Sequence, residues 1–146
     1  MNSLFQGVPI FAGLGLAALE TLAARARQFQ QPADAVVLRE GESSRMFYLI
    51  GEGAVRVCKN FGQPAEVELA RLGCGEFFGE MCILETLPRS ATVQTVNPSI
   101  FFGLSSMDFL HLYNQMPREY GILVLNLARD LSRRLRRLDE VFAARH

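Results

Sequence analysis

The sequence has little of what most metal sites and nucleic-acid surfaces require. Lysine and arginine together number 15, as do aspartate and glutamate, so the formal net charge is zero. Nothing in this balance points to a nucleic-acid partner. The two histidines, His111 and His146, lie outside every predicted strand, whereas a catalytic metal usually needs clustered histidines and a carboxylate. No nucleophile–base arrangement is evident either, so an enzyme is the least favoured class.

Cysteine is also scarce. Cys58, Cys74 and Cys82 show no metal-ligand spacing. An odd number of cysteines without a secretion signal predicts free thiols in a reducing cytoplasm. We expect Cys82 to be a small buried hydrophobe, with a reactive thiol at a helix N-terminus as the alternative.

Long apolar runs are missing as well. Residues 8–24 are largely apolar, but Pro9 and Glu20 interrupt them and no basic residue precedes them. The stretch is too short and broken to be a signal peptide or to cross a bilayer. We therefore expect a cytoplasmic protein with no membrane partner.

From about residue 33 to about residue 105 the chain has the pattern of short strands. Apolar runs or alternations end at turns that contain Gly, Asn or Pro. Strands are predicted at residues 36–38, 46–50, 54–59, 66–72, 91–96 and 100–104. Short strands at this spacing are typical of a sandwich or jelly roll.

Helical patterns flank the strands. Apolar spacing predicts an amphipathic helix from about Leu16 to Gln28, within an N-terminal helical segment of about residues 8–30. Ser106 is expected to cap a short helix, and Pro117 suits the first turn of a helix that runs to about Ala143. The prediction is one mostly β domain over residues 1–146, with a β-roll at about 33–105 and C-terminal helices at about 106–143.

The stretch of residues 75–93, GEFFGEMCILETLPRSATV, carries the most specific chemistry. Glu80 and Arg89 are charged residues in largely apolar surroundings. Buried charges are costly unless they are paired or hydrogen-bonded. The two side chains therefore either pair with each other, as in a surface salt bridge on a turn, or meet a ligand that has both a hydroxyl and an anion.

The residue types favour a sugar phosphate. Gly79 allows the backbone to approach a ligand closely, and a helical turn beginning at Glu80 would point free amides and a positive dipole at an anion. Arg89 offers a fork of donors that fits a phosphate, and Ser90 adds a hydroxyl. The Glu80 carboxylate can accept hydrogen bonds from sugar hydroxyls.

This stretch resembles the phosphate-binding cassette of cyclic-nucleotide-binding domains. The family pattern reads apolar-Gly-Glu-x-small-apolar, a variable gap, and then Arg-Ser/Thr/Ala-Ala-x-apolar. Residues 78–83 match it, except that Cys82 stands where a smaller residue is usual, and residues 89–93 match throughout. Residues 41–53 are similar to the first conserved segment of the family, with Ser44 as a slight departure. The resemblance covers about residues 8–140 and implies a double-stranded β-helix, or jelly roll, with an N-terminal helix and a long C-terminal helix.

The resemblance also implies roles for individual residues. Glu80 would take the ribose 2′-hydroxyl and Arg89 the cyclic phosphate, with help from nearby backbone amides and the Ser90 hydroxyl. In bacterial catabolite-activator-type relatives, the turn that holds Arg134 places polar residues over the base. Those relatives have Thr-Ser where this chain has Arg134-Leu135, which weakens any carry-over of their adenine preference. The predicted ligand-binding residues are Phe78, Gly79, Glu80, Met81, Cys82, Arg89, Ser90, Ala91 and Arg134.

Cyclic AMP is the expected ligand and cyclic GMP is the alternative. Cyclic-GMP-selective kinase domains tend to have Thr after the cassette arginine, where this chain has Ser90. No metal and no cofactor other than the nucleotide is expected.

The predicted C-terminal helix carries an apolar stripe at heptad-like spacing. Such a stripe could pair two subunits into a homodimer, or it could pack on the sheet. Its members are Val124, Ala128, Leu131, Leu135, Leu138 and Phe142. Arginines on the same helix are interspersed with acidic residues, so a solvated face is favoured over a nucleic-acid or anionic-membrane surface.

The expected function is that of a cyclic-nucleotide sensor, similar to cyclic AMP receptor proteins. The given sequence ends after the long helix, so we expect a stand-alone module without a helix-turn-helix domain and without DNA as a partner. Movement of the C-terminal helix would pass the signal to an unidentified effector protein or between subunits. The alternatives are the ligand-binding half of a catabolite-activator-type transcription regulator, a cyclic-GMP sensor, and an enzyme on a jelly-roll scaffold.

Overall fold

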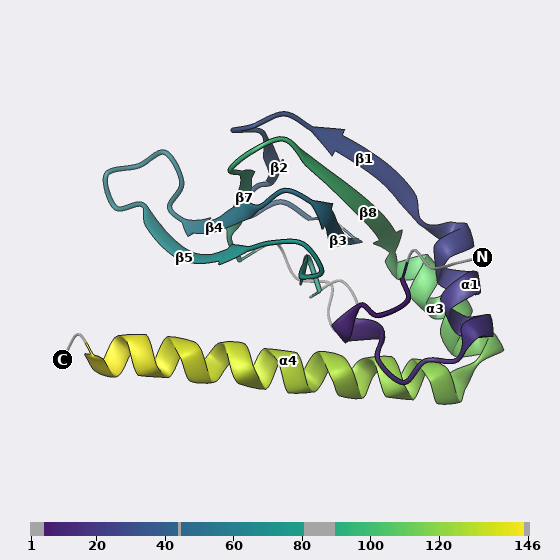
Figure 1. Ribbon diagram of the computed structural model, residues 1–146. Helices are drawn as coiled ribbons and strands as arrows, with labels where there is room; N and C mark the ends of the chain where they lie inside the picture. The colour runs from purple at the N-terminus through teal and green to yellow at the C-terminus, as the bar shows by residue number, and fades with distance from the viewer. Residues whose placement is uncertain (1–4, 44, 81–89, 145–146) are drawn as a thin grey trace. The chain divides into compact units, whose positions relative to one another are not determined.

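The structure, a computed structural model, describes residues 5–43, 45–80 and 90–144. The chain divides into two compact units, one of residues 24–110 and the other of residues 1–23 together with 111–146. The unit of residues 24–110 contains two four-stranded sheets, in which every pairing between strands is antiparallel (Figure 1).

The first sheet has the strand order β1-β8-β3-β6. Its strands are β1 (Arg27–Gln31), β8 (Ser99–Ser105), β3 (Met46–Glu52) and β6 (Phe77–Phe78). The second sheet has the order β2-β7-β4-β5, with β2 (Val36–Leu38), β7 (Thr92–Thr95), β4 (Val55–Lys59) and β5 (Val67–Leu72). Strands that follow one another along the chain mostly belong to different sheets, as in a jelly roll, so the predicted fold class is confirmed.

One hydrophobic cluster receives side chains from both sheets. Ile50, Phe78 and Phe101 come from the first sheet, and Leu38, Val55, Leu72 and Val93 come from the second. Apolar area removed from water is the main driving force for such packing. The cluster therefore holds the two sheets together.

The glycine at position 53, between β3 and β4, is required by its surroundings. Its φ is +91°, and an added Cβ would overlap the Ser99 hydroxyl and lie 2.7 Å from the Pro98 carbonyl oxygen. Any larger residue would be strained both by its backbone conformation and by these contacts.

The prediction that residues 26–30 are helical is wrong. The N-terminal helix α1 (Leu16–Arg25) ends before Gln28, and β1 begins at Arg27. β1 pairs with β8 along its whole length, from Arg27 opposite Gly103 to Gln31 opposite Ser99. Its sequence RQFQQ has only Phe29 as an apolar residue, so local pattern carries no strand signal and the long-range pairing decides the conformation.

Two further expectations on the strands need correction. β5 was predicted to alternate between buried and exposed residues, but only Leu72 of this edge strand is buried. β6 was not predicted at all, because two residues are too few to show a period.

The helix α3 (Ser106–Gln115) starts one residue after its cap. The Ser105 hydroxyl accepts a hydrogen bond from the Asp108 amide at 3.2 Å, and Asp108 Oδ2 accepts one from the Ser105 amide at 2.7 Å. This reciprocal pattern is a capping box. Ser105, and not Ser106 as predicted, is therefore the cap.

The other compact unit contains a 3-10 turn, η1 (Pro9–Phe11), and the long helix α4 (Pro117–Ala144). Pro117 occupies the first turn as predicted. The Asn126 side-chain amide donates to the carbonyls of Ile10 and Ala12 at 3.0 and 2.8 Å. This side chain thereby joins α4 to the N-terminal segment. Among the described residues, no helix combines the length and the apolar character needed to cross a membrane.

Candidate functional site

The chain enters the predicted cassette from the short strand β6. Phe78 pairs with Tyr48 of β3, and its side chain is 3% exposed. Its ring stacks on Tyr48 with centroids 5.1 Å apart and meets Phe101 edge-on at 5.4 Å. The apolar residue before the Gly-Glu motif is thus fixed in the core.

The two Gly-Glu pairs of this stretch lie on either side of β6. Gly75-Glu76 precedes the strand and Gly79-Glu80 follows it. In the first pair, the Gly75 amide donates to the Ile50 carbonyl at 2.9 Å. The Glu76 carboxylate accepts a hydrogen bond from the Gly73 amide at 3.0 Å. Glu76 therefore stabilises the turn that leads into β6, and its carboxylate is committed to the protein.

The second pair follows directly after β6. Gly79 is buried and has a φ of +81°, in the left-handed region that residues with a side chain adopt at a cost. Glu80 follows at a partly exposed position. Met81, Cys82 and Arg89 lie outside the described residues.

The chain leaves the cassette through Ser90 and Ala91 into β7. Ser90 is exposed and Ala91 half-buried, while Thr92 and Val93 are buried. Val93 belongs to the same hydrophobic cluster as Phe78. The core therefore fixes both ends of the predicted cassette, one in each sheet.

Two polar residues beside the cassette were missed by the sequence analysis. Lys59 Nζ donates to the Ser90 carbonyl at 2.6 Å and lies 3.2 Å from Glu40 Oε2. A hydrogen bond from the Asn60 amide, followed by the contact with Lys59, holds the pKa of Glu40 below its usual range. Lys59 is the single lysine of the sequence, which is a signal that could have drawn attention to it.

Arg134 belongs to the other compact unit. Its Nε lies 2.7 Å from Asp130 Oδ2, one turn earlier on α4. This is an ion pair by distance, although Oδ2 accepts no well-directed hydrogen bond. The Arg134 side chain is 22% exposed.

The described cysteines are free thiols, as predicted. Burial raises the pKa of Cys58, which keeps its thiol protonated and unreactive. Cys74 is exposed, and its thiol donates to the Gly51 carbonyl with the sulfur 3.2 Å from the oxygen. The prediction for Cys82 falls on a residue that the structure does not describe.

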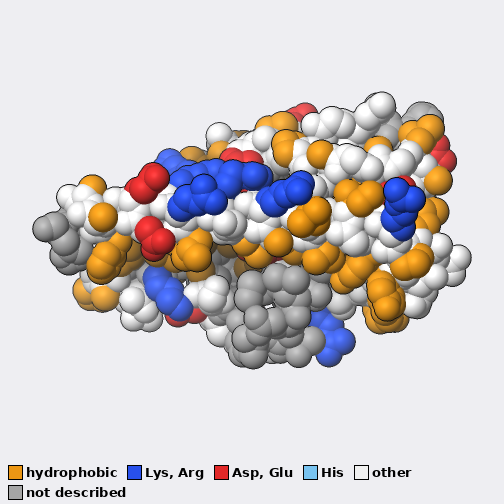
Figure 2. Space-filling model, turned by 90° about the horizontal axis from the view of Figure 1, so that it is seen from below, with side chains coloured by type: hydrophobic (Ala, Val, Ile, Leu, Met, Phe, Trp, Pro, Cys, Tyr) orange, Lys and Arg blue, Asp and Glu red, His pale blue; other side chains and the backbone are white. Residues whose placement is uncertain are grey.

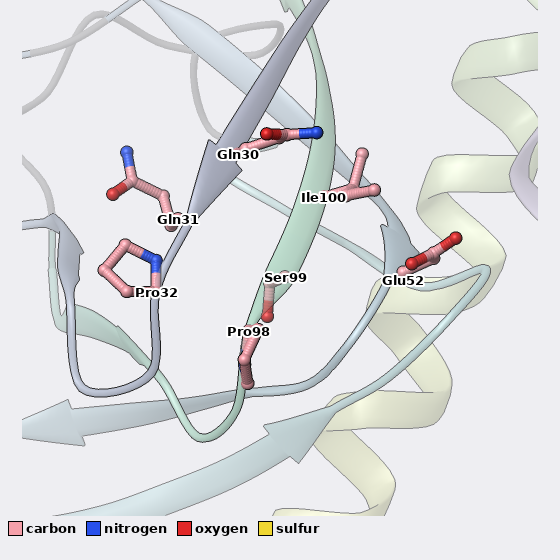
Figure 3. A pocket seen from close by; sticks show the side chains of 7 residues that line it. All are labelled: Gln30, Gln31, Pro32, Glu52, Pro98, Ser99 and Ile100. Carbon is pink, nitrogen blue, oxygen red and sulfur yellow. The ribbon is translucent and has the colours of Figure 1, made fainter.

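A separate hollow of about 450 Å³ lies where β1 and β3 end and β8 begins (Figure 3). It is lined by Gln30, Gln31, Pro32, Glu52, Pro98, Ser99 and Ile100. None of these belongs to the cassette. The Ser99 hydroxyl donates to the Asn97 carbonyl at 2.8 Å.

Known proteins resemble this chain over most of its length. It is 31% identical over 134 residues to the cyclic AMP receptor protein of Thermus thermophilus, an alignment of 92% of this chain and 60% of that protein. It is 40% identical over 115 residues to a cyclic nucleotide-gated potassium channel of Mesorhizobium japonicum, covering 78% of this chain and 30% of the channel. The chain thus spans less than two thirds of the length of these relatives.

Solved structures share the fold. A cyclic nucleotide-binding domain from Methylobacillus flagellatus superposes with a TM-score of 0.87 at 24% identity, covering 99% of this chain and 85% of that one. The catabolite activator protein of Thermus thermophilus gives a TM-score of 0.78 at 30% identity, covering 93% and 62%. The family model of the cyclic nucleotide-binding domain matches residues 28–116, which is more than half of the sequence. The chain therefore belongs to the cyclic nucleotide-binding domain family.

Proposed function

We propose that this chain is a regulatory module that binds cyclic AMP at the cassette of residues 75–93. One observation carries the proposal. The Gly79–Glu80 pair follows a core strand, with Gly79 buried in a left-handed conformation, inside the region that matches the family. A glycine there leaves room for a ligand beside the backbone, and the next side chain is a carboxylate that can accept sugar hydroxyls.

The proposed binding roles follow the family motif. Glu80 accepts a hydrogen bond from the ribose 2′-hydroxyl, and Arg89 binds the cyclic phosphate through two parallel donors. Backbone amides of the cassette and the Ser90 hydroxyl complete the phosphate site, and Arg134 is the residue assigned to the base. The full proposed set is Phe78, Gly79, Glu80, Met81, Cys82, Arg89, Ser90, Ala91 and Arg134.

Cyclic AMP is preferred over cyclic GMP in this proposal. Its support is the ligand named for two of the relatives. One is a cyclic AMP receptor protein. Another, 34% identical over 93 residues, is the regulatory subunit of a cAMP-dependent protein kinase from Schizosaccharomyces pombe. Ser90 stands where cyclic-GMP-selective domains tend to have Thr, and its hydroxyl suits either nucleotide. A cyclic-GMP-selective sensor remains the alternative that a titration distinguishes.

The output of the module is a movement of α4 upon nucleotide binding, without any catalytic step. A ligand shifts such an equilibrium only by its differential affinity for the two helix positions. The partner is an effector protein or a second copy of the chain. The alternative is the ligand-binding part of a catabolite-activator-type regulator. Its support is the alignment with the Thermus receptor, of which this chain covers 60%.

We further propose that two copies pair through α4. Its heptad-spaced stripe includes Leu135, Leu138 and Phe142, which are 61%, 48% and 67% exposed in the single chain. Figure 2 shows hydrophobic side chains on the face seen from below, beside a group of Lys and Arg side chains. Apolar positions at this spacing are typical of helices that pair with other helices.

Calorimetric titration with both nucleotides tests the proposal. We expect saturable binding of cyclic AMP at one site per chain and weaker binding of cyclic GMP. Tighter binding of cyclic GMP would favour the alternative ligand. If neither nucleotide binds, the proposed function is wrong.

A further inference from the structure

The sequence contains a single lysine, Lys59, and this residue lies next to the cassette. Lys59 ends β4, and its ammonium contacts the Ser90 carbonyl at 2.6 Å and Glu40 Oε2 at 3.2 Å. An ammonium is a compact donor that can bond in several directions. It can therefore serve a carbonyl and a carboxylate at once.

Glu40 connects Lys59 to Asn60 and Thr92 through hydrogen bonds. Its Oε1 accepts a hydrogen bond from the Asn60 amide at 3.0 Å, and its own amide donates to the Thr92 hydroxyl at 2.9 Å. Thr92 is 4% exposed and begins β7. Glu40, Lys59, Ser90 and Thr92 thus form a polar anchor that joins the residue two positions after β2, the end of β4 and the start of β7.

The anchor contributes more by fixing the position of the Ser90 backbone than by the attraction between the Lys59 and Glu40 charges. The Lys59 and Glu40 side chains are 45% and 32% exposed, so water and salt weaken their Coulomb attraction. The hydrogen bond to the Ser90 carbonyl comes from a charged donor and is short, which makes it stronger than an ordinary amide hydrogen bond. Its effect is to hold the peptide group of Ser90 beside the sheet.

We propose that Lys59 and Glu40 position the downstream half of the cyclic-nucleotide cassette. Ser90 directly follows the proposed phosphate ligand Arg89, and the anchor holds its carbonyl in place before the nucleotide arrives. Lys59 and Glu40 are positioning residues that act through Ser90 and do not contact the nucleotide. Preorganisation of this kind increases affinity by reducing the entropy lost on binding. The inference rests on the proposed function at the same cassette.

Three variants test the anchor by cyclic AMP titration. Lys59→Met keeps the apolar stem but removes the donor. We expect an affinity about 3- to 10-fold weaker, less than the full value of a charged hydrogen bond, because Lys59 is partly exposed to solvent and acts on the nucleotide only through Ser90. Lys59→Arg restores a charged donor, and its affinity should be within about 2-fold of the parent. Arg71→Met is the matched control, because Arg71 pairs with Glu68, 2.8 Å away on the same strand β5 and outside the anchor. Circular dichroism checks that each variant is folded.

The outcomes separate the two proposals. If the parent protein binds cyclic AMP and Lys59→Met binds it equally well, the anchor has no positioning role and the inference is wrong. The same follows if Arg71→Met loses as much affinity as Lys59→Met, since the loss would then be a general effect of removing a surface cation. If the parent binds neither cyclic nucleotide, the proposed function fails and the inference fails with it.

A second measurement needs no variant. Lys59 carries the single side-chain amine of the protein, and its 45% exposure lets a small acylating reagent reach it. Binding couplings are reciprocal, so a nucleotide that benefits from the anchor must also stabilise it. We expect cyclic AMP to slow acylation of Lys59 by about 3- to 10-fold, the same factor as the affinity change. The chain's α-amino group serves as the internal reference, and an unchanged ratio of the two rates would overturn the inference.

Discussion

Arg89 is the residue whose loss should weaken nucleotide binding most. Removing one partner of a desolvated charge pair costs about 2–5 kcal/mol, because the other charge stays without its partner. Arg89→Ala should therefore reduce cyclic AMP affinity roughly 30- to 4,000-fold. Calorimetric titration measures the change, with Arg71→Ala as a control for the loss of an arginine elsewhere in the same unit. An unchanged affinity in Arg89→Ala would contradict the assignment of Arg89 to the cyclic phosphate.

Glu80 should have a smaller effect. Glu80→Gln keeps one oxygen that accepts a hydrogen bond from the ribose and removes only the charge. We expect a loss of about 5- to 30-fold, from about 1–2 kcal/mol for a hydrogen bond that loses its charge assistance. The matched variant is Glu76→Gln, since Glu76 bonds to the Gly73 amide. A larger loss of affinity in Glu76→Gln than in Glu80→Gln would contradict the assignment of the second Gly-Glu pair to the ligand.

Acid should destabilise the β4–β5 hairpin through its glutamates. A hydrogen bond from the Gly62 amide, followed by one from Arg56, lowers the pKa of Glu66, and Arg71 lowers the pKa of Glu68. A folded-state pKa below the unfolded value stabilises the fold above the unfolded pKa, about 4.3 for glutamate. That stabilisation is lost as the pH falls through the lowered folded-state value.

Urea unfolding at pH 7, about 4.5 and about 3 measures this dependence. The free energy of unfolding should fall toward acid, and Glu66→Gln should make the decrease smaller. Glu20→Gln, which changes an exposed glutamate on α1, is the control. If the free energy of unfolding depends equally on pH in Glu66→Gln and in the parent, the contacts of Glu66 do not contribute to the loss of stability in acid.

Two turn glycines offer a matched comparison of backbone strain and crowding. Gly53 and Gly62 have φ values of +91° and +78°. An added Cβ at Gly53 would lie 2.7 Å from the Pro98 carbonyl oxygen, whereas no atom lies within 4 Å of one at Gly62. Gly62→Ala should cost about 1–2 kcal/mol from the left-handed conformation. Gly53→Ala should cost about 1–3 kcal/mol more because of overpacking. Thermal unfolding measures both, and equal costs would contradict the steric reason.

At the scale of single elements, α4 is the part that should associate. Glu in place of Leu138 or Leu135 puts a charge into the proposed seam, where burial without a partner is costly. Leu138→Glu should therefore convert a dimer to a monomer, as measured by sedimentation. Leu125→Glu is the matched control, because Leu125 is 49% exposed on the same helix but lies outside the heptad-spaced stripe. A parent protein that is monomeric at high concentration would contradict the dimer.

The elements also differ in how far they could be predicted. The long α4 helix has a sustained period and a proline in its first turn, and its start at Pro117 was predicted from these local signals. The local pattern predicts a helix through Gln28, because RQFQQ lacks a strand pattern. Only the pairing with β8 makes this segment the strand β1. The cap of α3 was misplaced by one residue for a similar reason, since either serine suits a cap and the bond with Asp108 selects Ser105.

For the whole molecule, the proposed response to cyclic AMP is a shift of α4. Hydrogen exchange over residues 117–144 should therefore change when cyclic AMP is added, because the helix changes its surroundings. β8, in the core of the sheet unit, serves as the internal comparison. Exchange of α4 that is identical with and without saturating cyclic AMP would contradict the proposed output while leaving binding itself intact.

The sequence by itself determined the cassette motif, six of the eight described strands and the two flanking helical regions. These depend on signals within a few residues, such as the Gly79–Glu80 pair, the turn glycines and the apolar periods of β3, β4 and β8. Only the tertiary structure decided which sheet each strand joins, that β1 is a strand, and that Lys59 holds the Ser90 carbonyl. Those features depend on contacts between residues distant in the chain, such as the 31 positions from Lys59 to Ser90, and no local pattern records which distant partners will meet.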